Sequence, residues 1–302
     1  MAEHAALCAT GDGTVIPSSA DVEARPASPD YYPISPAVAI NVSVSVVIPA
    51  MNEARNLPHV FDSMPEWVDE IVLVDGHSVD DTVAVAQRLY PGVKVVSQAG
   101  RGKGDALIAG FAACRGDIIV MIDADGSADC REIARFVGAL VSGADYAKGS
   151  RFTSGGGSDD ITTTRRCGNL ILRGFVNLLF GTRYTDLCYG YNAFWTRHLP
   201  ALALDCAGFE VETVMNIRAA QAGLRVQEIP SHEYSRVHGA SNLRAIRDGL
   251  RIARVIARER VFASAHRRAG RDEDGYRSSL PLRSSLSEIS PNESVRSADR
   301  QL

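Results

Sequence analysis

The stretch "DIIVMIDADGS", from Asp117 to Ser127, joins a short apolar run to two closely spaced carboxylates. The run is continuous and rich in β-branched side chains, which is typical of a strand that is covered on both faces in a parallel sheet. Asp123 and Asp125 then fall at the carboxyl end of this strand, where open α/β sheets bind their ligands. The stretch by itself predicts either a divalent cation held between two repelling carboxylates or an Asx-type turn that caps the next helix.

Strand and helix patterns alternate on both sides of this stretch. We expect strands at residues 42–48, 69–75, 93–97, 117–123, 145–150, 189–195 and 224–230. We expect helices at residues 53–64, 80–90, 104–114, 131–143, 165–181, 208–223 and 242–263, and we expect Pro49 to end the first strand. This alternation predicts an α/β fold with a doubly wound, mainly parallel sheet.

Composition and charge narrow the class of protein. The 302 residues are 45% apolar and 23% charged, which predicts a globular domain at 41–263 between disordered tails at 1–40 and 264–302. A net charge of -4 favours no nucleic-acid partner, and six cysteines without a C-x-x-C pair favour neither a zinc site nor a disulfide framework. No apolar run reaches the roughly 18 residues that cross a bilayer, so we expect a cytoplasmic protein.

Polar residues collect after three of the predicted strands. Asn52 and Glu53 follow the first strand, Asp75 ends the second, and the two aspartates of the opening stretch follow another. Because the carboxyl ends of parallel strands share one edge, these side chains are expected to converge at a nucleotide site.

Cations for the phosphates of such a ligand occur in three places. Arg151 follows a strand, and Arg165 and Arg166 follow the Gly/Ser/Thr-rich stretch "TSGGGSDDITTT". Lys103 in "GRGKGD" lacks the spacing of a P-loop, so we assign it a supporting role.

In their order, these motifs resemble a metal-dependent, inverting glycosyltransferase of family 2 with the GT-A fold. "VVIPAMNEARNL" is similar to the opening V-V-I-P-x-x-N-E of that family, "DGHSVDDT" to its D-D-G-S-x-D-x-T, and "MIDADGS" to its D-x-D. Further on, "GSRF", "DLCYGYNAF", "GFEVET" and "RVHGASN" resemble the branch that transfers mannose or glucose to polyprenyl (dolichyl) phosphates.

The resemblance implies a role for individual residues. Asp123 and Asp125 would hold Mg²⁺ or Mn²⁺ on a nucleoside-diphosphate-sugar, and Asp186 would act as a base or position the acceptor. The remaining donor residues would be Pro49, Asn52, Glu53, Asp75, Lys103 and Ala124, with Arg151 and Arg166 near the phosphates, and the acceptor residues would be Arg236, Gly239 and Ser241.

The chain also departs from the pattern of that family. Gly76 replaces the second Asp of D-D-G-S, which concerns recognition of the base. Tyr189, Asn192 and Asn242 replace the usual Ser, Arg and Lys on the acceptor side. A polyprenyl phosphate and a soluble acceptor therefore both stay open at this stage.

Several alternatives remain open from the residues alone. The chain could instead be an inactive nucleotide-sugar-binding partner, whereas a nucleotidyltransferase lacks support because no Gly-rich basic loop follows the first strand. Glu210 and Glu212 would approach the cleft or face solvent, and His232 and His238 would be structural or lie near a phosphate. The Arg-rich last helix suits a solvated face or a peripheral contact with the inner face of the plasma membrane.

Overall fold

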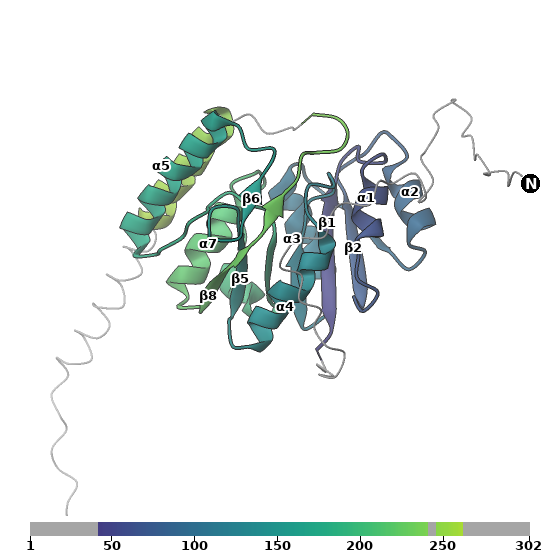
Figure 1. Cartoon of the computed structure of the whole chain (residues 1–302), viewed down its shortest axis with the longest axis horizontal. Helices are drawn as coiled ribbons and strands as arrows, with labels where there is room; N and C mark the ends of the chain where they lie inside the picture. The colour runs from purple at the N-terminus through teal and green to yellow at the C-terminus, as the bar shows by residue number, and fades with distance from the viewer. Residues whose placement is uncertain (1–41, 241–245, 262–302) are drawn as a thin grey trace, which may run out of the picture. The chain divides into compact units, whose positions relative to one another are not determined.

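A seven-stranded sheet with helices on both faces forms the centre of the computed structural model, which describes residues 42–240 and 246–261 (Figure 1). Its strands are β1 (Val44–Ala50), β2 (Glu70–Asp75), β3 (Lys94–Ser97), β4 (Ile118–Met121), β5 (Tyr146–Ser150), β7 (Asn192–Trp195) and β8 (Val226–Pro230). The order is β3-β2-β1-β4-β7-β5-β8, and only β7 runs antiparallel to its neighbours. The expected mainly parallel α/β fold is confirmed. A small second sheet pairs β6 (Gly157–Ser158) with β9 (His232–Glu233).

The helices cover the two faces of the sheet because successive side chains of each strand point to opposite sides. Val46 and Ile48 of β1 pack in one cluster with α1 (Leu57–Asp62), α2 (Thr82–Leu89) and α4 (Ile133–Val141). Val47, between them, packs on the other face with α3 (Lys103–Ala113) and α7 (Val211–Gln221). The remaining helical segments are η2 (Cys130–Glu132), α5 (Thr163–Phe180), η3 (Thr196–His198), α6 (Leu199–Leu202) and residues 246–261.

Two local expectations are corrected by the structure. Strand β1 continues through Pro49 to Ala50 instead of ending before the proline. The backbone groups of Val47 and Pro49 point toward β4, but the pairing of β1 with β4 stops at Val47, so the missing N–H of Pro49 removes no hydrogen bond from that pairing. Helix α1 begins only at Leu57, because Pro58 is favourable in the first turn of a helix and unfavourable further inside one.

The two predicted tails, 1–40 and 264–302, lie outside the described residues, as do residues 242–245 and 262–263 of the predicted last helix. Within the described part of the chain, no helix combines the length and the apolar character that a membrane span requires.

The strand order reverses between β1 and β4, and this reversal positions the candidate site. Chain that leaves β1 turns toward β2, whereas chain that leaves β4 turns the other way, so the carboxyl ends of β1 and β4 border an open crevice.

Candidate active site

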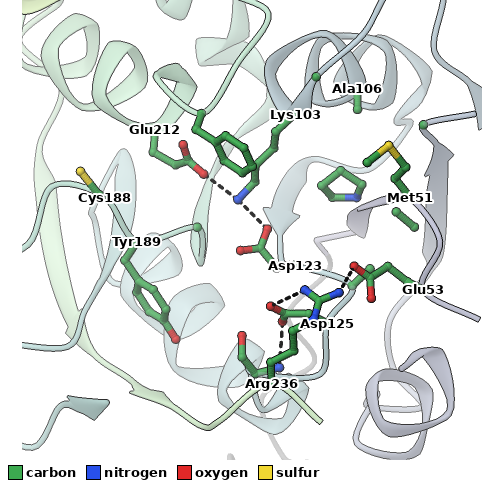
Figure 2. A pocket seen from close by; sticks show the side chains of 18 of the residues that line it. Met51, Glu53, Lys103, Ala106, Asp123, Asp125, Cys188, Tyr189, Glu212 and Arg236 are labelled. Carbon is green, nitrogen blue, oxygen red and sulfur yellow. Dashed lines mark hydrogen bonds and ion pairs between the residues drawn. The ribbon is translucent and has the colours of Figure 1, made fainter. Parts of the chain in front are cut away.

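A cleft of about 650 Å³ lies at the carboxyl ends of β1, β2 and β4 (Figure 2). Its walls come from these strand ends, from the first residues of α3 and α5, from α7 and from the segment after β9. Pro49, Glu53, Lys103, Asp123, Ala124, Asp125, Arg236 and Gly239, all expected from the sequence, line it. Glu53, Asp123 and Asp125 therefore converge at one edge of the sheet, as the strand order predicted.

The two aspartates of D-x-D each face a cation in this cleft. Asp123 Oδ1 lies 2.5 Å from Nζ of Lys103, and Asp125 Oδ2 lies 3.4 Å from Nη1 of Arg236. The other oxygen of Asp125 accepts a hydrogen bond of 3.0 Å from the backbone N–H of Ser127, which is the Asx-type turn that the sequence left open. The cap of η2 comes from Asp129 instead, so both D-x-D side chains keep an oxygen toward the cleft.

Lys103 lies between two carboxylates. Its Nζ is 2.5 Å from Asp123 and 2.6 Å from Glu212 Oε1 (Figure 2). Burial alone lowers the pKa of Lys103, but the two carboxylates outweigh it and raise the pKa above its ordinary value. Gly190 leaves room for this contact, because a Cβ there would lie 2.7 Å from Asp123 Oδ2 and 2.8 Å from Lys103 Nζ.

Glu53 anchors the segment after β9 to the loop after β1. Its carboxylate is buried, accepts a hydrogen bond of 2.6 Å from Asn56 Nδ2 and pairs with Arg236. Asn56 also donates to the carbonyl of His238 and accepts from its N–H. Burial raises the pKa of Glu53, against the hydrogen bonds from Asn56 and Arg236. The predicted donor and acceptor elements thus touch each other through Arg236, which also reaches Asp125.

Two predicted donor residues brace loops instead of lining the cleft. Asn52 Oδ1 accepts from the N–H of Val79 at 2.8 Å, and Asp75 Oδ1 accepts from the N–H of Ser78 at 3.1 Å. Gly76 lines the cleft at this point. Asn52 thus joins the loop after β1 to the loop after β2, and Asp75 braces the loop after β2 from within. Their expected contact with a nucleoside stays a prediction.

Arg151 and Asp186 form a buried ion pair beside the cleft and are absent from its lining. Nε and Nη2 of Arg151 donate to the two carboxylate oxygens of Asp186 at 2.7 and 3.0 Å, and Nη1 donates to Glu233 at 3.0 Å. Asp186 is 0% exposed and Arg151 5%. Burial raises and Arg151 lowers the pKa of Asp186, with a net decrease. The expectation that Asp186 and Arg151 touch the reacting groups stays a prediction, because the two residues bond to each other behind the lining of the cleft.

The first turn of α5 directs one arginine toward the cleft and the next one away. Arg165 lines the cleft, 2.9 Å from Asp160 and 3.9 Å from Glu233. Arg166 is exposed, with its guanidinium 5.6 Å from the ring centre of Phe152. Because consecutive helical residues point about 100° apart, Arg165 and not Arg166 lines the cleft, and the role expected of Arg166 near the phosphates stays a prediction.

Sequence reasoning left the role of Glu212 open, and the structure places its side chain in the cleft against Lys103. Glu210 instead lies 3.8 Å from Arg251, and His232 lies 3.1 Å from Asp159. Phe209, Cys188 and Tyr189, which lie within the motifs "GFEVET" and "DLCYGYNAF" but had no assigned role, also line the cleft. Ser241 and Asn242 lie outside the described residues.

Tyr189 and Asn192, two of the departures on the acceptor side, lie in the protein interior. The hydroxyl of Tyr189 lies 2.9 Å from Ser231 Oγ, and its ring lies 4.9 Å from the guanidinium of Arg151. Asn192 is fully buried and donates to the carbonyl of Tyr189. The Tyr189 ring thus packs against Arg151. An arginine at position 192 would add a second buried cation beside Lys148, whose register partner is Asn192.

The donor set for a metal consists of two carboxylates. Among the described residues, no group of three His, Cys, Asp or Glu side chains is arranged to hold an ion. Asp123 and Asp125 supply the hard oxygen ligands that Mg²⁺ and Mn²⁺ prefer, and Mg²⁺ in such sites takes its other ligands from phosphates and water. The residues present therefore fit a cation that arrives with a diphosphate.

Comparisons with known proteins agree with this geometry. The family model "Glycosyl transferase family 2" matches residues 45–216, more than half of the chain. Glycosyltransferase AglJ of Haloferax volcanii is 30% identical over 210 residues, which are 68% of this chain and 68% of the relative. The undecaprenyl-phosphate mannosyltransferase of Micrococcus luteus is 32% identical over 216 residues, which are 66% of this chain and 87% of the relative.

A solved structure shares the fold. Glucosyl-3-phosphoglycerate synthase from Mycobacterium tuberculosis, crystallised with Mn²⁺, UDP-glucose and phosphoglyceric acid, is 26% identical. The match has a TM-score of 0.57 and covers 72% of this chain and 79% of that chain.

Proposed function

Because this chain belongs to glycosyl transferase family 2 and is a glycosyltransferase, we propose that it moves a sugar from a nucleoside-diphosphate-sugar to a polyprenyl phosphate, with inversion. Family membership confirms the resemblance that the sequence motifs indicated. The observation that carries the proposal is the D-x-D pair, whose two carboxylates face the same cleft opposite the cations Lys103 and Arg236.

The donor would lie over the ends of β1 and β4. Asp123 and Asp125 would hold Mg²⁺ or Mn²⁺ on its diphosphate, and the bound cation would offset the charge that develops on the leaving group. Lys103 and Arg236 would move from the carboxylates toward phosphate oxygens, since these are the cations that the carboxylates hold in the cleft. Glu53 would keep Arg236 in reach through their ion pair.

The acceptor proposal rests on Arg165. Its guanidinium group lines the cleft in addition to the cations proposed for the donor, which suits a phosphate acceptor. A phosphate oxygen is already anionic, so its attack on the anomeric carbon needs no general base. This agrees with an Asp186 whose two oxygens are both taken by Arg151. The name of the Micrococcus luteus relative supports a polyprenyl phosphate, and we propose a protein that works on the cytoplasmic face of a membrane.

The test is Mn²⁺-dependent turnover of UDP-, GDP- and dTDP-sugars with and without a short-chain polyprenyl phosphate. We expect one donor to react, the lipid phosphate to accelerate it, and the product to have the opposite anomeric configuration by NMR. Asp125→Ala should lower the rate by about 10³-fold, because two-carboxylate metal sites stabilise the leaving group. Asp117→Ala, at the opposite end of β4, is the control and should retain the wild-type rate.

The outcomes separate the alternatives. Turnover that ignores the lipid but increases with phosphoglyceric acid would redirect the proposal to a soluble acceptor. Absence of both donor binding and turnover would favour an inactive partner protein, and an undiminished rate for Asp125→Ala would contradict the metal assignment.

A further inference from the structure

Helix α5 and the helix at residues 246–261 lie side by side at one end of the main sheet (Figure 1). Both helices expose apolar side chains to solvent. On α5, Leu170, Ile171, Phe175 and Leu178 are between 53% and 80% exposed. The opposite face of α5, with Leu172 and Val176, is buried. The outer face is therefore apolar without contributing to the core, which is unusual in a monomeric protein.

The helix at residues 246–261 repeats this arrangement. Ile246, Leu250 and Val261 are between 56% and 78% exposed. At about 100° per residue, they fall with Ala253 and Ala257 in one stripe about 80° wide. Ile252 and Ile256 lie on the other side of the helix, in the same buried cluster as Leu172 and Val176 of α5. The two exposed stripes thus belong to helices that pack together, and we call them the two-helix surface.

The charges that border the two-helix surface are positive. Arg247, Arg251 and Arg254 are exposed along one side of the apolar stripe of residues 246–261. The acidic residues of that helix, Asp248 and Glu259, are 8% and 3% exposed. Helix α5 contains no acidic residue. An apolar stripe with arginines beside it and no exposed acid is complementary to anionic lipid headgroups.

We propose that the two-helix surface docks on an anionic phospholipid bilayer, with its apolar stripes at the boundary between headgroups and acyl chains. The inference deepens the proposed function and rests on it for one point, the entry of a lipid acceptor. Arg165 of α5 and Ile252 of the other helix both line the cleft, so the helices that touch the bilayer also form the cleft wall. A polyprenyl phosphate would then pass from the bilayer to the arginines of the cleft without leaving the protein surface.

A second copy of the chain fits this surface less well than a bilayer. In a two-fold symmetric dimer the same patch meets itself, which would bring the arginine rows together with no exposed acid on either helix to compensate them. An anionic bilayer supplies the missing negative charge.

The test is sedimentation of the full-length protein with vesicles of phosphatidylcholine alone and with phosphatidylglycerol. We expect binding to the anionic vesicles and a fall in affinity of about tenfold or more for the double variant Leu178→Glu/Ile246→Glu. Arg247→Gln/Arg254→Gln should weaken binding to phosphatidylglycerol and leave the weak binding to phosphatidylcholine unchanged. Val79→Glu, at a side chain that is 92% exposed in the loop after β2, is the matched control and should bind like the wild type.

Absence of wild-type binding, or full binding by Leu178→Glu/Ile246→Glu, would overturn the proposal, as would a wild-type dimer on gel filtration that this variant converts to a monomer. Donor hydrolysis by the same variants without vesicles separates the two proposals. Hydrolysis without vesicle binding would support the transferase function and contradict the docking surface. Vesicle binding without turnover of any donor would support the docking surface and contradict the transferase function.

Discussion

The strand-end side of the cleft and the side built around β5 and β9 use charged residues in opposite ways. At the ends of β1 and β4, Glu53, Asp123 and Asp125 pair with cations while facing the cleft. Beside β5 and β9, Arg151 and Asp186 satisfy each other in the interior. A charged residue in a family motif can therefore face a ligand or support the wall behind it, and the difference lies in whether its side chain lines the cleft.

The largest expected effect is a loss of stability on the side of the cleft where Arg151 and Asp186 pair in the interior. Asp186→Ala leaves the Arg151 guanidinium buried with only Glu233, so the free energy of unfolding should fall by about 3–5 kcal/mol. Asp125→Ala removes a partly exposed carboxylate and should change it by less than about 1 kcal/mol. Urea unfolding followed by circular dichroism measures both. A stable but inactive Asp186→Ala would reverse the assignment and make Asp186 a catalytic residue.

The second prediction concerns Arg236, which joins the two sides. Arg236→Gln should lower the transfer rate by about 10²-fold, because a cation opposite the diphosphate is lost. The same variant should bind Mn²⁺ more tightly without donor, by up to about fivefold, because the partly exposed ion pair with Asp125 no longer competes.

Steady-state kinetics and Mn²⁺ titration by electron paramagnetic resonance measure these two effects. Arg131→Gln is the control, because it breaks an ion pair with Asp129 outside the cleft lining. Equal Mn²⁺ affinity in the wild type and Arg236→Gln would show that Arg236 does not compete for Asp125.

The third prediction is an opposite pH dependence on the two sides. Burial raises the pKa of Glu53 above its ordinary 4.5, so its contribution to stability is present below that pH and is lost as pH rises through the raised value. Burial raises the pKa of Asp186, but Arg151 outweighs burial and lowers this pKa below 3.8. The contribution of Asp186 to stability is therefore lost as pH falls through the lowered pKa.

Free energies of unfolding across pH 3 to 7 should show both effects, at about 1.4 kcal/mol per unit of pKa shift. Glu53→Gln should remove a loss of stability above pH 4.5, and Asp186→Asn should remove one below pH 3.8. If both variants remove the pH dependence of the free energy of unfolding over the same pH range, the two sides of the cleft do not have opposite pH dependences.

The smallest expected effect tests how tightly the strand-end side is packed. A Cβ at Gly76 would lie 3.2 Å from the carbonyl oxygen of Ala50 and from Cβ of Met51. Gly76→Ala should therefore lower the free energy of unfolding by less than about 1 kcal/mol. Gly138→Ala in α4, where no atom lies within 4 Å, should raise it by about 0.5–1 kcal/mol. Thermal unfolding of both variants decides whether Gly76 occupies a restricted position.

Much of the strand-end side could be predicted from the sequence. The buried runs of β1, β2 and β4 have apolar side chains on both faces, so a parallel sheet follows, and its carboxyl ends bring Glu53, Asp123 and Asp125 to one edge. That inference needs no knowledge of side-chain packing. Asn52 and Asp75 do not line the cleft, because both side chains bond to loop backbone nearby.

The sequence by itself determined the α/β class, the family and the edge of the sheet at which the acids meet, because these depend on local periodicity and on the order of motifs. Only the tertiary structure decided that Arg165 and not Arg166 faces the cleft, and that Glu212 pairs with Lys103. It also decided that Arg151 and Asp186 neutralise each other. The direction and burial of a side chain depend on neighbours that are distant along the chain, and a linear pattern does not contain them.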